Sequence, residues 1–120
     1  MPVADKINVL IVEEDPMIGF DLSVELEEAG FNVVGVAPTV AKALHLLERQ
    51  RCDLAVLDVN LGQETSAPIA RALIAAGVPF VAVTGYAVDQ CPEEFATAPL
   101  LSKPFQTARL VATLKRQLHQ

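Results

Sequence analysis

Short runs of apolar residues alternate with amphipathic stretches five times along this chain, and this alternation restricts the fold more than any other feature. Val and Ile dominate the first four runs, a composition typical of strands that are buried on both faces of a parallel sheet. The predicted strands cover residues 7–12, 32–37, 54–58, 80–84 and a weaker run around 100–101.

The stretches between these runs carry apolar residues at helical spacing. Asp15, followed by proline, is a favourable N-cap for the first helix, and Thr39 can cap the second. Five helices are predicted. The first three begin after Asp15, after Thr39 and near residues 66–68, and the fourth and fifth cover residues around 89–97 and 110–118.

Because a helix joins each strand to the next, we expect an α/β fold, a (βα)5 doubly wound parallel sheet of five strands. The flavodoxin-like order is expected, with the second strand at one edge, followed by the first, third, fourth and fifth. A chain of 120 residues that is 52% hydrophobic can bury one core but is too short for two ordinary domains. We therefore predict a single domain over residues 1–120.

The charge balance excludes several classes of partner. Nine basic and 15 acidic residues give a formal net charge of −6, which disfavours binding to nucleic acid and to anionic lipid.

No apolar run approaches the roughly 18 residues that cross a bilayer, and the N-terminus lacks the apolar core of a signal peptide, so a cytoplasmic location is expected. Cys52 and Cys91 are expected to be reduced thiols.

Chemically active residues follow four of the predicted strands. In open parallel sheets the binding site lies at the carboxyl ends of the strands, so we expect these residues to meet at one edge. They are Glu13-Glu14-Asp15 after the first strand, Asp58 at the end of the third, Thr84 at the end of the fourth, and Lys103 after the fifth.

This set of side chains suits phosphoryl transfer to a carboxylate. Glu13, Glu14 and Asp58 carry a charge of −3 and Lys103 returns +1, so a hard divalent cation with oxygen ligands would balance the remainder, and Mg²⁺ fits. A carboxylate beside a metal, a hydroxyl and a lysine is a suitable nucleophile for forming an aspartyl-phosphate.

The ordered set of motifs resembles the receiver domain of two-component response regulators. The motifs are Asp58 within residues 57–61, the acidic cluster after the first strand, Thr84-Gly85, and Lys103-Pro104-Phe105, and the resemblance covers essentially the whole chain. It implies a phosphoprotein of a phosphorelay, a signalling protein rather than an enzyme, which accepts a phosphoryl group from a histidine kinase.

The resemblance also implies a role for each residue of the site. Asp58 would be the phosphoacceptor. Glu13 and Glu14 would bind Mg²⁺ together with the backbone carbonyl of Asn60. Thr84 and Lys103 would contact the phosphoryl group, and the bond between Lys103 and Pro104 would be cis.

Two positions depart from the family pattern. Glu14 stands where the second acidic residue is usually Asp, and its extra methylene is expected to weaken or alter Mg²⁺ binding. An alternative pair of Glu14 and Asp15 stays open. Leu100 replaces the aromatic residue that usually switches with the threonine. Tyr86 completes a Phe-x-x-x-Thr-Gly-Tyr signature that resembles a subgroup of stand-alone receivers. We expect it to modulate the site, either by taking over part of the switching or by gating access of water to the phosphoryl group.

Three functions follow. The first is a single-domain response regulator, with no output domain unless the chain is excised from a longer regulator. It would bind a histidine kinase or phosphotransfer protein, and a downstream protein through the face of the fourth helix, fifth strand and fifth helix. The second is a pseudo-receiver that does not switch by phosphorylation, given Glu14 and Leu100. The third is a flavodoxin-like ligand domain. This hypothesis is weak, because no Gly-rich phosphate-binding loop follows the first predicted strand of this chain.

Overall fold

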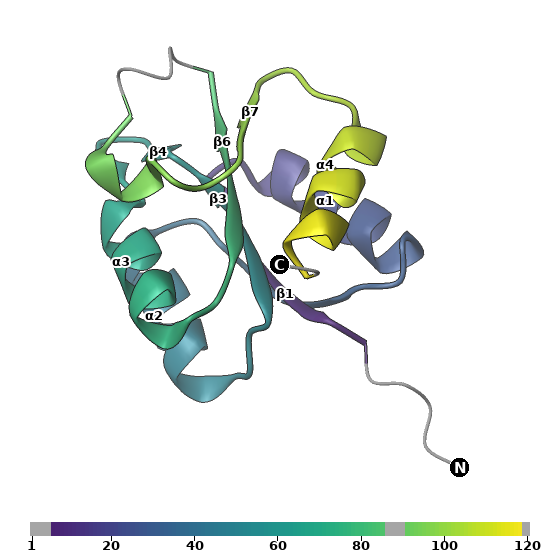
Figure 1. Cartoon of the computed structure of the whole chain (residues 1–120), viewed down its shortest axis with the longest axis horizontal. Coiled ribbons are helices and arrows are strands. Elements are labelled where there is room, and N and C mark those ends of the chain that lie inside the picture. Colours follow the sequence, from purple (N-terminus) through teal and green to yellow (C-terminus); the bar gives the residue numbers. More distant parts are fainter. Residues whose placement is uncertain (1–5, 86–90, 119–120) are drawn as a thin grey trace.

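A five-stranded parallel sheet forms the middle layer of the molecule (Figure 1). The computed structural model describes residues 6–85 and 91–118. The strand order is β2-β1-β3-β6-β7, which is the order predicted from the sequence. The strands are β1 (Asn8–Val12), β2 (Asn32–Ala37), β3 (Leu54–Asp58), β6 (Phe80–Thr84) and β7 (Leu100–Ser102).

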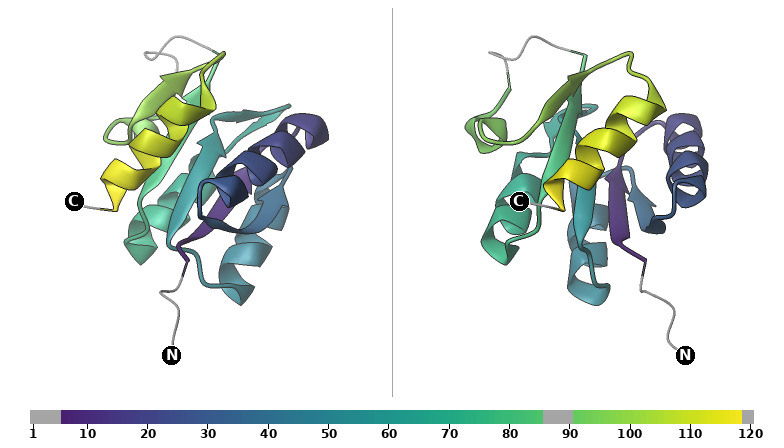
Figure 2. Two further views of the ribbon diagram at one scale, coloured as in Figure 1. Left: turned by 90° about the vertical axis from the view of Figure 1, so that its right-hand side faces the viewer. Right: turned by 45° about the vertical axis from the view of Figure 1, so that its right-hand side comes forward.

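Helices cover both faces of this sheet, as the doubly wound prediction requires (Figure 2). One face packs against α1 (Pro16–Glu28) and α4 (Thr107–Gln117), and the other against α2 (Val40–Arg49) and α3 (Ala67–Ala76). Successive side chains of a strand point to opposite faces, so each central strand contributes to both cores. Within the described ranges, none of the helices is long and apolar enough to cross a membrane.

The predicted N-caps position the first two helices. The Asp15 carboxylate accepts hydrogen bonds from the backbone N–H groups of Met17 and Ile18, at 2.9 and 3.3 Å. The Thr39 hydroxyl accepts one from the N–H of Lys42 at 3.2 Å. A side-chain cap of this kind satisfies an N–H group that the first turn leaves without a helical partner.

The helix predicted around residues 89–97 is wrong over the described part of that range, 91–97. A single 3-10 turn, η2 (Glu93–Phe95), stands there instead, and residues 89 and 90 lie outside the described residues. The physical reason is Pro92 and Pro99, which leave only six residues between them. Each proline disfavours the helical conformation of the residue before it. The buried ring of Phe95 packs edge-on against Phe80, with ring centroids 6.1 Å apart.

A small antiparallel hairpin follows Asp58 and was not predicted. Its strands are β4 (Asn60–Leu61) and β5 (Glu64–Thr65), joined by a turn in which Gly62 has a φ of +68°. Glycine adopts this left-handed conformation without the strain that a side chain would cause. Glu64 then accepts a hydrogen bond from the N–H of Val40 at 3.1 Å, which attaches the hairpin to the start of α2.

We expect Phe95→Ala to lower the free energy of unfolding by about 3 kcal/mol, because it empties the buried space beside Phe80. Ile74→Ala is the matched control, since the Ile74 side chain on α3 is 54% exposed and its loss should change stability by less than about 0.5 kcal/mol. Chemical denaturation of both variants measures the difference. Equal, small effects would show that η2 does not replace the missing helix in the core.

Candidate functional site

The predicted site residues meet at the carboxyl edge of the sheet. Glu13 follows β1, Asp58 ends β3, Thr84 ends β6 and Lys103 follows β7. A hollow of about 340 Å³ opens at this edge. It is lined by Glu13, Glu14, Asp15, Ile18, Asp58, Asn60, Gly62, Gly85 and Lys103.

Lys103 joins two carboxylates across this hollow. Its Nζ donates a hydrogen bond to Asp58 Oδ2 at 2.8 Å and another to Glu13 Oε1 at 3.3 Å. The side chain of Asp58 is 10% exposed and that of Glu13 is 5% exposed. Two carboxylates buried near each other are costly unless a positive charge compensates them, and the Lys103 ammonium supplies that charge.

The backbone fixes the position of Glu13. Its N–H donates to the Ala37 carbonyl of the neighbouring strand at 3.0 Å, and its Oε2 accepts from the N–H of Asp15 at 3.1 Å. Burial raises the pKa of the Glu13 carboxyl, and the charge of Asp58 adds to this, while the Asp15 N–H and Lys103 act in the opposite direction. Glu13 therefore holds its proton more tightly than an ordinary glutamate.

Lys103 remains cationic at neutral pH. Burial by itself lowers its pKa, but the hydrogen bond and the charges of Asp58 and Glu13 outweigh that cost, so the pKa is raised. The Lys103 N–H donates to the Thr84 carbonyl at 2.9 Å, and the peptide bond between Lys103 and Pro104 is cis. The residue is thus held at both its backbone and its ammonium.

Glu14 and Asp15 play different parts from Glu13. Both side chains are exposed, and the Asp15 carboxylate caps α1. Because Asp15 is engaged in this cap, the alternative pair of Mg²⁺ ligands, Glu14 and Asp15, is disfavoured. The Glu14 carboxylate lies against the hairpin turn, with Oε2 only 3.0 Å from where a Cβ on Gly62 would stand. The turn therefore needs glycine for its φ, whereas the exposed Glu14 side chain could move to make room for a Cβ.

The remaining predicted residues lie close to this centre or outside the described residues. Thr84 is completely buried at the end of β6. Leu100 is half-buried on β7, paired with Ala82, two positions before the Ser102 that pairs with Thr84. Tyr86 lies outside the described residues, so its predicted modulating role has no structural account here.

Asn60 lines the hollow from the hairpin that follows Asp58, and this hairpin is the feature that sequence reasoning missed. The backbone around it is anchored, because the Val59 N–H donates to Val83 and the Val59 carbonyl accepts from the N–H of Ser66, both at 2.9 Å. Gly62, followed by the polar residues 63–66, was the available signal for a turn.

The oxygen donors of the hollow suit a hard divalent cation. Among the described residues, no group of three or more His, Cys, Asp or Glu side chains stands ready to enclose a metal ion. Mg²⁺, however, usually takes only one or two carboxylates and keeps water or phosphate oxygens as its other ligands. Glu13 and Asp58, already converging on one cation, meet that lower requirement.

We expect Glu13→Gln to stabilise the protein at pH 7, by on the order of 1 kcal/mol, the usual size of a single-residue effect. A carboxyl whose pKa is raised on folding favours the folded state below its unfolded pKa, near 4.5, and loses that contribution as the pH rises through the folded value.

The advantage of the variant should therefore be largest near neutral pH and vanish at pH values below 4.5. Denaturation of both proteins across this range, with a chelator present, measures the difference. A variant less stable than the original chain at pH 7 would contradict the expectation.

The chain is similar to known proteins. The family model of the response regulator receiver domain matches residues 9–115 of the chain. The Phyllosphere-induced regulator PhyR of Methylorubrum extorquens is 34% identical over an alignment of 120 positions, which covers 92% of this chain and 43% of PhyR. The chain spans about half the length of the curated relatives it matches first.

Solved structures of similar chains have the same fold. The solution structure of SdrG from Sphingomonas melonis Fr1 is 39% identical with a TM-score of 0.82, covering 97% of this chain and 99% of SdrG. A CheY-like receiver domain from Methanospirillum hungatei JF-1 is 26% identical with a TM-score of 0.85, covering 96% and 95%. The order of strands, the motifs at their ends and the match over nearly the whole chain lead to one conclusion: this chain belongs to the family of response regulator receiver domains.

Proposed function

We propose that the chain accepts a phosphoryl group on Asp58, in the presence of Mg²⁺, from a histidine kinase or phosphotransfer protein. The observation that carries this proposal is the 2.8 Å hydrogen bond from Lys103 Nζ to Asp58 Oδ2 in the hollow at the sheet edge. It places a cation within reach of the oxygens that a phosphoryl group on Asp58 would carry. Receiver domains are signalling proteins, and we propose that this one signals through protein contacts.

In this mechanism an Asp58 carboxylate oxygen attacks the phosphorus. The new P–O bond forms as the bond to the donor's histidine nitrogen breaks, and that nitrogen keeps the electron pair. Lys103 moves its hydrogen bond from the carboxylate to a phosphoryl oxygen, where it offsets charge that develops during transfer. The buried Thr84 hydroxyl is proposed to contact another phosphoryl oxygen.

Glu13, Glu14, Asp58 and the Asn60 carbonyl are the groups proposed to hold Mg²⁺. When bound, the ion supplies positive charge that neutralises phosphoryl oxygens in the transition state. Both Glu13 and Glu14 line the hollow, but Glu13 is buried, whereas Glu14 is exposed beside Gly62. Glu14 is therefore the ligand whose position would have to change most.

The proposed surface for a downstream partner changes with the fold. The sequence predicts a face of fourth helix, fifth strand and fifth helix, but over the described residues η2 takes the place of that helix. The face that remains includes β7 and the start of α4, with a hollow of about 380 Å³ lined in part by Leu100, Phe105 and Arg109. Half-buried Leu100 would connect this surface to the neighbourhood of Thr84.

A pseudo-receiver that does not switch by phosphorylation is the second candidate. The position of Glu14 favours it, because a displaced ligand would weaken Mg²⁺ binding. Leu100 favours it as well, because it cannot act as an aromatic switch. Both candidates keep the fold and a partner surface, and they differ in whether Asp58 is modified.

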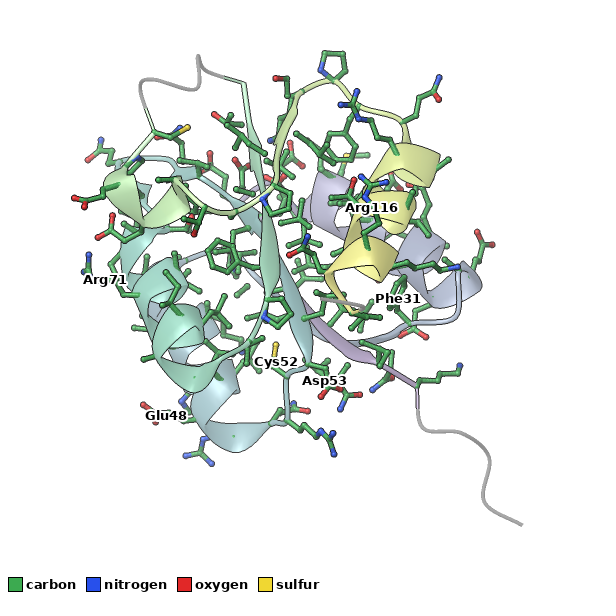
Figure 3. All side chains as sticks on the ribbon, in the orientation of Figure 1. Phe31, Glu48, Cys52, Asp53, Arg71 and Arg116 are labelled. Atoms are coloured by element: carbon green, nitrogen blue, oxygen red, sulfur yellow. The ribbon has the colours of Figure 1, made fainter. Side chains whose placement is uncertain are left out.

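The phosphoacceptor is tested by incubating the protein with Mg²⁺ and acetyl phosphate. We expect a mass gain of one phosphoryl group, absent in Asp58→Asn and absent with a chelator. Asp53→Asn is the control, since Asp53 precedes β3 at the opposite end of the sheet (Figure 3). No gain in the original chain, or an equal gain in Asp58→Asn, would overturn the proposal and leave the pseudo-receiver.

Glu14→Asp tests the metal set separately. The shorter side chain should raise the affinity for Mg²⁺ about threefold, equivalent to about 0.6 kcal/mol. Titration of each protein with Mg²⁺, followed by NMR shifts of backbone amides at the sheet edge, measures the change. An unchanged or weaker affinity would show that Glu14 is not limited by its length.

A further inference from the structure

Helix α1 carries a row of large apolar side chains that points into solvent. Met17 is 77% exposed, Phe20 67% and Val24 40%. Their spacing of three and four residues places them on one face of the helix, opposite the buried Leu22 and Leu26. Most exposed apolar residues stand singly, so a row of three on one helix indicates a surface that another molecule covers.

The same helix is strongly acidic. Four of the chain's 15 acidic residues lie on α1, and the helix contains no Lys or Arg. Glu25 and Glu27 are engaged, with Thr107 and with the N–H of Val33. Asp21 and Glu28 are exposed and lie at helical spacing beside the apolar row.

Helix α4 has the opposite character. Three of the nine basic residues, Arg109, Lys115 and Arg116, lie on it, and it contains no Asp or Glu. Exposed Ala108 and Ala112 lie on the side of the helix opposite its buried leucines. The outer surface of α4 therefore carries small side chains next to basic ones. Small residues let a second helix approach closely, since the distance between packed helices depends on the side chains at the contact.

The two helices lie on the same face of the sheet (Figure 2). The Thr107 hydroxyl donates to Glu25 at 2.8 Å, which ties the start of α4 to α1. A two-fold rotation about an axis in the plane of this face can therefore lay α1 of one copy on α4 of the other, and the reverse contact follows by symmetry. Large residues would meet small ones, and acidic residues would meet basic ones, at both contacts.

We propose that the chain forms a symmetric homodimer in which the Met17, Phe20 and Val24 row of α1 packs on the Ala108 and Ala112 surface of the partner copy's α4. Pairing α1 with α1 would bring two acidic helices together, so charge disfavours it. The contact joins helices of only 13 and 11 residues, so a weak dimer is expected, with a dissociation constant on the order of 10–100 μM.

Sedimentation equilibrium over a range of concentrations tests the dimer. The average mass of the original chain should rise from one copy towards two, and added salt should weaken the association because the attraction is partly ionic. Phe20→Asp should weaken it at least about tenfold. Ile74→Asp is the control, because Ile74 is exposed and apolar but lies on α3, on the other face of the sheet.

Charge exchange distinguishes this arrangement from others. A variant with Asp21→Arg and Glu28→Arg makes the exposed side of α1 basic, because Glu25 and Glu27 are engaged with Thr107 and Val33. A variant with Arg109→Glu and Lys115→Glu makes α4 acidic. Each should be monomeric alone, and an equimolar mixture should form dimers, since both contacts are then attractive. Circular dichroism confirms that each variant is folded.

Three outcomes would overturn the proposal. The original chain could stay monomeric at about 1 mM, well above the expected dissociation constant. The Arg109→Glu and Lys115→Glu variant could dimerise as the original chain does, which would place the contact elsewhere. Phe20→Asp could associate as strongly as Ile74→Asp. A surface that instead captures a basic amphipathic helix of another protein would give the first of these results.

Discussion

The ammonium of Lys103 lies between the carboxylates of Glu13 and Asp58, and the rest of the site depends on this contact. Strand order brings the two acids together at the sheet edge, where burial makes their mutual repulsion costly. Lys103 offsets that repulsion, and its backbone is fixed to Thr84 by a hydrogen bond. A phosphoryl group or a divalent cation that entered the hollow, as proposed, would therefore meet charges that are already arranged but not yet fully balanced.

The placement of this site could be predicted from the sequence because parallel strands leave little freedom. Once β1, β3, β6 and β7 are parallel, residues that follow them share one edge whatever the loops do. The Asp15 and Thr39 caps were equally predictable, since a cap involves only a few neighbouring residues. The features that could not be predicted depend on tertiary contacts, and the one wrong helix resulted from overlooked helix-breaking prolines. The helix expected around 89–97 overlooked Pro92 and Pro99, and the closeness of Glu14 to Gly62, which is distant in the sequence, arises only in the folded chain.

The two faces of the sheet are also chemically distinct. The face of α1 and α4 presents an acidic helix and a basic helix beside each other. The opposite face is covered by α2, α3 and the 3-10 turn η2, which contributes the buried Phe95 to its core. Charge separated in this way within one surface has a self-complementary pattern that a net charge of −6 conceals. Overall charge governs solubility and long-range encounter, but the local pattern decides which surfaces can touch.

The hydrogen bond from Val40 to Glu64 links the chemistry of the sheet edge to a helix on its flank. The hairpin begins two residues after Asp58, so a displacement there is carried over a very short length of chain. A carboxylate at a helix start contributes about 0.3–1 kcal/mol. If the hairpin moved by the length of one hydrogen bond, the first turn of α2 would lose that contribution and keep only the Thr39 cap. Faster amide hydrogen exchange in this turn would then report a movement that begins beside Asp58, at a distance from the site itself.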